Sequence, residues 1–273
     1  MPARAEVVLV HGLWHQPRHF AKLVEELRSR GLTVHTPHLH RGSLAADTDA
    51  VQSVVDSCAS PPLVLGHSYG GSVVTGLERI SHLLYVAAFV PATGESGASL
   101  GGRAALINSI VEHHDDGTSR LRPELAGDLL YADCSPEDRA RATSLLLPQR
   151  SGHGRGVPAR TAWLTTPSTY IVCRQDKAFD PTLQLRMARR CTTYEALDSG
   201  HSPFLSQPGA VADAVVAILS SIDCAFLAIC QTRRLTWGEG RTGGRGIFDG
   251  RQTWTTSNSA TPAWTSHRWP WAA

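Results

Sequence analysis

The sequence contains no apolar run that approaches the roughly 20 residues a helix needs to cross a bilayer. Its six cysteines are dispersed, and no two of them form a Cys-x-x-Cys pair that could bind zinc or act as a redox dithiol. These absences argue against a membrane protein, a zinc finger and a dithiol oxidoreductase. We therefore expect free thiols and no membrane partner.

We also expect no secretory signal in this sequence. The strand-like run at 6–10 follows the first residue so closely that basic, apolar and cleavage segments have no room before it. We therefore expect a cytoplasmic protein. Charged residues are few, at 18%, and hydrophobic residues make up 42%, as in an ordinary soluble enzyme. A chain of 273 residues is long enough to bury a sizeable core.

The net charge of +2 is unevenly distributed. Six arginines lie beyond residue 230 against two carboxylates, which leaves a balance of about −2 for residues 1–230. A basic tail on a slightly acidic body is not the pattern of a nucleic-acid-binding surface, so we expect no nucleic-acid partner. Residues 223–273 are rich in Arg, Trp and Gly and lack periodicity. They are predicted to be a poorly ordered tail, with an aromatic binding tail as the alternative.

Short apolar runs alternate with amphipathic stretches along residues 1–222. The run EVVLV is continuous and mainly β-branched, as in a strand covered on both faces within a parallel sheet. Strands are predicted over 6–10, 33–35, 61–66, 83–90, 169–173 and 193–197. Helices are predicted over 17–31, 47–58, 69–80, 181–190 and 208–222. Asp47 or Asp49 is expected to cap the helix over 47–58.

This alternation predicts an α/β fold over residues 1–222, with a mostly parallel sheet of about six strands and helices on both faces. Residues 91–168 interrupt the rhythm with Gly-rich, polar and short helical pieces. Because that segment joins two strands of the sheet, we expect an inserted lid over one end of the sheet.

The stretch VLGHSYGGSV at 64–73 places Ser68 where a buried strand turns into a helix rich in small residues. A serine hydroxyl becomes a good nucleophile only when it is exposed, close to a base and served by donors for the developing oxyanion. The small residues at 66, 70 and 71 let the turn close and expose the hydroxyl. Ser68 is therefore predicted to be a catalytic nucleophile, the alternative being a small residue in a tight connection.

Two backbone N–H groups are expected to form the oxyanion hole. Tyr69 follows the nucleophile at a helix N-terminus, where N–H groups point outward. The second donor is expected from HGLW at 11–14, and we choose Leu13 because Gly12 before it permits unusual backbone conformations. The alternative for this segment is a tight turn without chemistry.

The base and its orienting acid are expected after later strands, in the order serine, acid, histidine. His201 lies between the strand over 193–197 and the final helix, and Asp176 follows the strand over 169–173 by three residues. An acid at this place can fix the tautomer of the imidazole. The other candidates for the acid are Asp180, Asp198 and Glu95.

The remaining histidines are not predicted to carry chemistry. His67, beside the nucleophile, is expected to pack or to hydrogen-bond locally. HTPHLH at 35–40 and HHDD at 113–116 have no recognised ligand spacing. We therefore predict no metal site.

Together these segments resemble the α/β-hydrolase superfamily, in particular the compact esterase branch that includes plant methylesterases and hydroxynitrile lyases. The resemblance covers roughly residues 5–222 and rests on VVLVHGLWHQPRHF, GHSYGGSV, LLYVAAFVP, YIVCRQDKAFDPTLQLRMA and LDSGHSPFLSQP. It implies Ser68 as nucleophile, His201 as general base and acid, and Asp176 as its partner. It also implies Leu13 and Tyr69 as oxyanion donors, and no metal or organic cofactor.

The lyase members of that branch look different at two positions. They have a threonine where this sequence has Gly12 and a lysine where it has Ser202. Because the lysine supplies positive charge for a leaving cyanide, its absence argues against lyase chemistry. The resemblance therefore implies an esterase.

The substrate expected from the residues is a small-molecule carboxylic ester with an apolar portion, cleaved through an acyl-enzyme. An apolar pocket is predicted to include Trp14, Phe89, Trp163, Phe204 and the lid residues Leu145–Leu147. A lactonase or amidase with the same triad is one alternative, and a non-catalytic small-molecule receptor is another. No oligomeric state is predicted.

Overall fold

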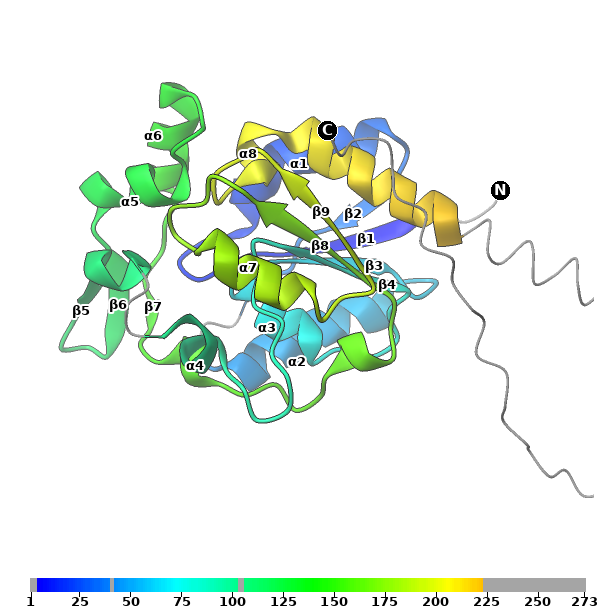
Figure 1. The fold of residues 1–273 in the computed structure, drawn as a ribbon, viewed down its shortest axis with the longest axis horizontal. Helices are drawn as coiled ribbons and strands as arrows, with labels where there is room; N and C mark the ends of the chain where they lie inside the picture. Colours follow the sequence, from blue (N-terminus) through cyan, green and yellow to red (C-terminus); the bar gives the residue numbers. More distant parts are fainter. Residues whose placement is uncertain (1–3, 40–41, 103–105, 223–273) are drawn as a thin grey trace, which may run out of the picture. The chain divides into compact units, whose positions relative to one another are not determined.

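A six-stranded, all-parallel sheet organises the described residues of this computed structural model, which are 4–39, 42–102 and 106–222 (Figure 1). Its strand order is β2-β1-β3-β4-β8-β9. The strands are β1 (Glu6–Val10), β2 (Thr33–His35), β3 (Leu63–His67), β4 (His82–Val86), β8 (Ser168–Cys173) and β9 (Thr193–Leu197). The predicted α/β class and parallel sheet are confirmed.

Two strand boundaries differ from the prediction for identifiable reasons. β3 begins at Leu63 because the two prolines before it have no N–H to donate to a neighbouring strand. β4 ends at Val86, four residues earlier than expected, because Ala87 adopts a φ of 44°, outside the extended region.

The central strands bury side chains on both faces of the sheet. Along β1, Val7 and Leu9 belong to one apolar cluster and Val8 and Val10 to the other, since successive side chains point to opposite faces. This explains why the central strands read as continuous apolar runs. β9, at the edge of the sheet, is mostly exposed.

Helices cover both faces of the sheet, as Figure 1 shows. Residues of η1, α1 and the helical run over 208–222 pack into one cluster, and residues of α2, α3 and α7 pack into the other. The elements of this part are η1 (Pro17–Phe20), α1 (Ala21–Ser29), α2 (Leu44–Ser57), α3 (Gly70–Thr75), α7 (Pro181–Ala188) and α8 (Pro203–Ser206).

The start of α2 differs from the sequence expectation. The helix begins at Leu44, and the Ser43 hydroxyl accepts the hydrogen bond from the Ala46 N–H at 3.2 Å. Asp47 and Asp49 therefore lie inside the helix, and the prediction that one of them caps it is wrong. Asp47 is buried and accepts a hydrogen bond from the Tyr69 hydroxyl instead.

The segment between β4 and β8 carries its own small antiparallel sheet, in the order β5-β6-β7, which the sequence did not predict. These strands are short, and none of them shows an alternating apolar pattern of useful length. The elements are α4 (Gly97–Gly101), η2 (Leu106–Ile110), β5 (Val111–His113), β6 (Thr118–Leu121), α5 (Pro123–Leu130), α6 (Pro136–Ser144), β7 (Gln149–Arg150), η3 (His153–Arg155) and η4 (Ala162–Leu164).

The predicted tail, residues 223–273, lies outside the described residues. Among the described helices, none combines the length and the apolar character that a membrane crossing requires.

The cap of α2 can be tested by substitution. We expect Ser43→Ala to lower the free energy of unfolding by about 1 kcal/mol, because it removes the acceptor for an N–H of the first turn. Asp49→Ala, the matched control, should change it by less than about 0.5 kcal/mol. Urea unfolding of both variants measures the difference, and equal losses would contradict the assignment.

Candidate active site

Ser68 lies in the turn between β3 and α3 with a φ of 53°, in the left-handed region that residues other than glycine rarely adopt. The glycines after it allow this turn because the backbones approach closely. A Cβ on Gly70 would lie 2.4 Å from the Val10 carbonyl oxygen, and one on Gly71 would lie 2.2 Å from the Phe89 carbonyl oxygen. The turn leaves Ser68 partly exposed while its neighbours are buried.

His201 follows β9, and its imidazole reaches the acid that the sequence proposed. His201 Nδ1 and Asp176 Oδ2 are 2.7 Å apart, and both residues are buried. Ser68, Asp176 and His201 all line one cavity at the carboxyl edge of the sheet. In the described residues no hydrogen bond joins the Ser68 hydroxyl to the imidazole.

The alternative acids have other partners. Asp180 caps α7, where it accepts the Thr182 N–H at 2.7 Å. Asp198 accepts a hydrogen bond from the Gln175 amide, and Glu95 forms an ion pair with Arg190. None of these three carboxylates contacts the imidazole of His201, so the geometry favours Asp176.

The carboxylate of Asp176 is held by four donors. Its Oδ1 accepts the N–H groups of Ala178 and Phe179, each at 2.8 Å, and its Oδ2 accepts Gln184 Nε2 at 2.8 Å as well as the His201 bond. Such donors satisfy the hydrogen-bonding capacity of a buried carboxyl group. They also fix the direction in which Oδ2 faces the imidazole.

Gln184 is a residue of the site that the sequence analysis missed. Its amide also accepts the Cys173 N–H at 2.9 Å and donates to the Phe179 carbonyl at 2.8 Å, and the side chain is fully buried. The available signal was a glutamine on the apolar face of the helix predicted over 181–190. A buried amide there needs polar partners.

His67 supports the loop that carries His201. Its Nε2 lies 2.9 Å from the His201 carbonyl oxygen, and the two ring centroids are 4.7 Å apart. Burial is the main cause that holds the pKa of His67 well below its usual value, and the neighbouring His201 lowers it further. The neutral ring can therefore donate from Nε2 to that carbonyl. The expected packing of His67 is confirmed by its ring contact with Phe204, whereas its hydrogen-bond partner lies far away in the chain.

The cavity has a volume of about 1520 Å³. In addition to Ser68, Asp176 and His201, four other residues predicted for the site line it. They are Leu13, Tyr69, Trp14 and Phe89. No hydrogen bond from the N–H of Leu13 or Tyr69 is present within the described residues. Both groups are therefore available to a ligand near Ser68.

Trp163 and Phe204 do not line this cavity, so their predicted place in the pocket is wrong. The Trp163 indole donates to the Pro91 carbonyl at 2.8 Å. It packs against the apolar cluster that contains residues of α2, α3 and α7. Phe204 is 2% exposed, and its ring packs edge-on against the rings of Phe20 and His67.

Leu146 and Leu147, also expected in the pocket, line a separate cavity of about 900 Å³ that is formed by residues of β6, α5 and α6 and of the loop after α6. Leu145 lines neither cavity.

The segment between β4 and β8 forms the outer wall of the cavity and holds two of its loops. Gln149 accepts the Trp14 N–H at 2.8 Å, beside the predicted oxyanion donor. Asp133 accepts the Gly200 N–H at 2.8 Å, next to His201. The wall also contributes Leu100 and other apolar residues.

Most of the chain matches a known protein family. A model of the alpha/beta hydrolase family matches residues 7–214. The chain belongs to the α/β-hydrolase family. The resemblance seen in the sequence is confirmed at this level.

Individual relatives agree with the assignment. An α/β hydrolase of Aspergillus novofumigatus is 27% identical over 233 residues, covering 75% of this chain and 92% of the relative. A pyrethroid hydrolase from Sphingobium faniae is similar in structure, with a TM-score of 0.70 and 20% identity, covering 79% of this chain and 97% of the other. Polyneuridine aldehyde esterase gives a TM-score of 0.69 at 20% identity, covering 79% and 99%.

The amide of Gln184 provides a test of how this α/β hydrolase holds Asp176. We expect Gln184→Met to lower the free energy of unfolding by about 1–3 kcal/mol, because it keeps the volume but leaves the buried Cys173 N–H and one Asp176 oxygen short of partners. Gln207→Met, at a more exposed amide, is the control. Urea unfolding compares the two, and an unchanged midpoint for Gln184→Met would contradict this role.

Proposed function

We propose that this α/β hydrolase is a serine-dependent hydrolase of small-molecule carboxylic esters with an apolar portion. The observation that carries the proposal is the geometry of three side chains at one cavity. Ser68 lies on a left-handed turn, and His201 faces the same cavity with its Nδ1 2.7 Å from a buried carboxylate. This combination meets the needs of nucleophilic acyl transfer.

In the proposed reaction His201 Nε2 takes the proton of the Ser68 hydroxyl as Oγ attacks the ester carbonyl. A rotation of the Ser68 side chain makes this hydrogen bond when substrate binds, since catalytic hydrogen bonds in ligand-free structures are often long. The Asp176 bond holds the proton on Nδ1 and leaves Nε2 free to act as base. The protonated imidazole then donates to the leaving alcohol.

The acyl group remains on Ser68 Oγ until a water molecule, deprotonated by His201 Nε2, attacks its carbonyl carbon. The protonated imidazole then returns the proton to Ser68 Oγ as the acid leaves. The Leu13 and Tyr69 N–H groups stabilise the oxyanion in both steps, and neither makes another hydrogen bond within the described residues. Each such donor contributes on the order of 3 kcal/mol to transition-state stabilisation. The apolar walls around Trp14, Phe89 and Leu100 favour a substrate with an apolar portion.

The names of the relatives support hydrolysis as the reaction class, because one is a pyrethroid hydrolase and another an aldehyde esterase. The same triad would also serve a lactonase or an amidase. A non-catalytic receptor on this fold is the competing class of function.

Removing the nucleophile separates an enzyme from a receptor. We expect Ser68→Ala to lower kcat for p-nitrophenyl esters by at least about 10⁴-fold, because no other hydroxyl takes its place at the turn. Wild type should be labelled by a fluorophosphonate probe and Ser68→Ala should not. Activity that survives the substitution would overturn the proposed chemistry, and an unlabelled wild type would favour a receptor.

The leaving group is tested with matched substrates. We expect the kcat/KM of wild type to be highest for p-nitrophenyl esters, lower for lactones and lowest for anilides of the same acyl groups. Within the esters, kcat/KM should rise with acyl length, since each buried methylene contributes up to about 0.8 kcal/mol. A higher rate on lactones or anilides would favour the alternative reactions.

The oxyanion loop is tested at Gly12. A Cβ there would lie 3.0 Å from Ser68 Cβ and 3.4 Å from Ser68 Oγ, so we expect Gly12→Ala to displace the Leu13 N–H and lower kcat by about 10²- to 10³-fold. The matched control is Gly209→Ala, where an added Cβ meets nothing within 4 Å. Steady-state kinetics measure both, and equal kcat values would contradict this role for the loop.

A further inference from the structure

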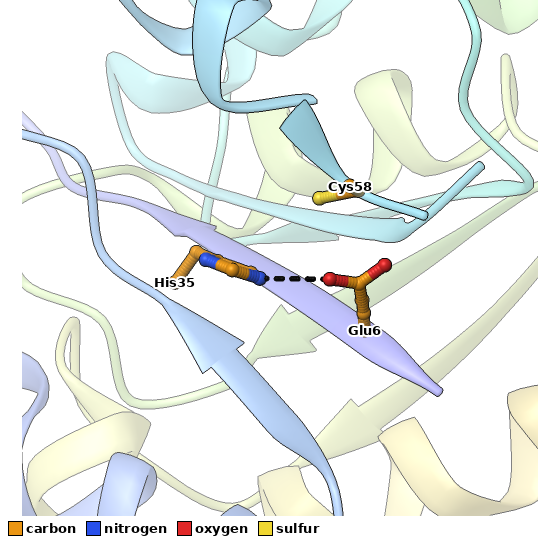
Figure 2. A group of neighbouring side chains, drawn as sticks. All are labelled: Glu6, His35 and Cys58. Atoms are coloured by element: carbon orange, nitrogen blue, oxygen red, sulfur yellow. Dashed lines mark hydrogen bonds and ion pairs between the residues drawn. The ribbon is translucent and has the colours of Figure 1, made fainter. Parts of the chain in front are cut away.

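Three side chains with metal-binding atoms meet at the opposite end of the sheet from Ser68. Figure 2 shows Glu6 on β1 and His35 on β2 facing one another, with the Cys58 thiol directed toward them from the end of α2. Their ligand atoms all lie within 4.8 Å of one another. The three residues are separated by 29 and 23 positions in the chain, so no spacing motif marks them.

The distances fit a tetrahedral zinc ion. With zinc bonds of about 2.0–2.3 Å to oxygen, nitrogen and sulfur, neighbouring ligand atoms of a tetrahedron lie about 3.3–3.7 Å apart. Glu6 Oε1 and His35 Nε2 are 3.2 Å apart, which already matches such an edge. The thiol needs to approach by no more than about 1.5 Å to complete three corners.

The chemistry of the three ligands also fits zinc. Imidazole, thiolate and carboxylate are its usual donors, and three protein ligands leave a fourth position for water. In the metal-free structure the Cys58 thiol donates to the Val54 carbonyl at 3.4 Å. Zinc binding would release the thiol proton to solvent, and the thiolate and carboxylate would together balance the 2+ charge.

The surroundings hold the ligands in place. Glu6 Oε2 accepts the Ala59 N–H at 2.8 Å, which fixes the carboxylate and leaves Oε1 facing His35. Arg79 donates to the carbonyls of Val55 and Cys58, which anchors the end of α2 that carries the thiol. Hydrogen bonds of this kind orient metal ligands.

We propose that Glu6, His35 and Cys58 form a zinc site that joins the start of β1, the end of β2 and the end of α2. Glu6 begins β1 while Ser68 follows the far end of β3, and β1 and β3 run parallel. In that register Glu6 lies level with Pro62, six positions before Ser68, so about 20 Å of strand separates the two. The metal would therefore stabilise the sheet without contacting the ester, and this proposal stands apart from the proposed function.

Cobalt, which substitutes for zinc and is visible in solution, tests the site on the full chain after treatment with a chelator. We expect one Co²⁺ per chain with a thiolate-to-cobalt charge-transfer band and tetrahedral d–d bands, displaced by one equivalent of Zn²⁺. Saturating Zn²⁺ should raise Tm by about 3 °C or more. The kcat for esters should stay the same with and without Zn²⁺.

The variants identify the ligands. Cys58→Ser should abolish the charge-transfer band, and His35→Ala and Glu6→Gln should weaken Co²⁺ binding by at least about tenfold. Cys191→Ser, a partly buried thiol outside the cluster, is the matched control and should bind as wild type does. Circular dichroism checks folding, and the partly exposed His35 and Glu6 decide the result if Cys58→Ser does not fold.

Absence of Co²⁺ binding by wild type would overturn the proposal, and the three residues would then form a hydrogen-bonded cluster only. A charge-transfer band that persists in Cys58→Ser, or wild-type affinity in both His35→Ala and Glu6→Gln, would overturn it as well.

Discussion

The left-handed backbone of Ser68 is the constraint on which the rest of the candidate site depends. A residue other than glycine at a φ of 53° costs of order 1–3 kcal/mol, and the surrounding structure must offset that cost. Here β3 lies buried in the centre of the sheet, and α3 packs against it through glycines that leave no space for a Cβ. The backbone of the turn is fixed because β3 and α3, the two elements that it joins, are both packed tightly.

The imidazole of His201 depends on supports from three other parts of the chain. Asp176, on the loop after β8, is hydrogen-bonded to Nδ1 of His201. Gln184 on α7 donates to the same carboxylate and holds it in place. His67, next to Ser68, contacts the His201 carbonyl, and Asp133 accepts the N–H of Gly200, the residue before His201. A catalytic geometry needs such locked neighbours, because small displacements are costly in rate.

The segment between β4 and β8 combines two tasks. It lines the cavity, and through Gln149 and Asp133 it is hydrogen-bonded to the loops that carry Leu13 and His201. A change in that segment can therefore alter both the shape offered to a substrate and the positions of the reacting groups.

The sequence alone determined the alternation of elements. Continuous β-branched runs can be buried only in a doubly covered sheet, and parallel neighbours require crossovers. The meeting of Ser68, Asp176 and His201, which follow β3, β8 and β9, could be predicted as well, because the carboxyl ends of parallel strands lie at one edge of the sheet. The elbow glycines around Ser68 were visible because close backbone approach leaves a local signature.

Only the tertiary structure decided which distant residues meet. The His67 contact with His201, the Asp133 contact with Gly200 and the Glu6, His35 and Cys58 cluster join positions far apart in the chain. Gln184 meets Asp176 across the turn that joins β8 to α7. Trp163 and Phe204 are aromatic like Trp14, yet packing buried them away from the cavity. Composition and spacing state what a side chain can do, whereas the packing of whole elements fixes what it faces.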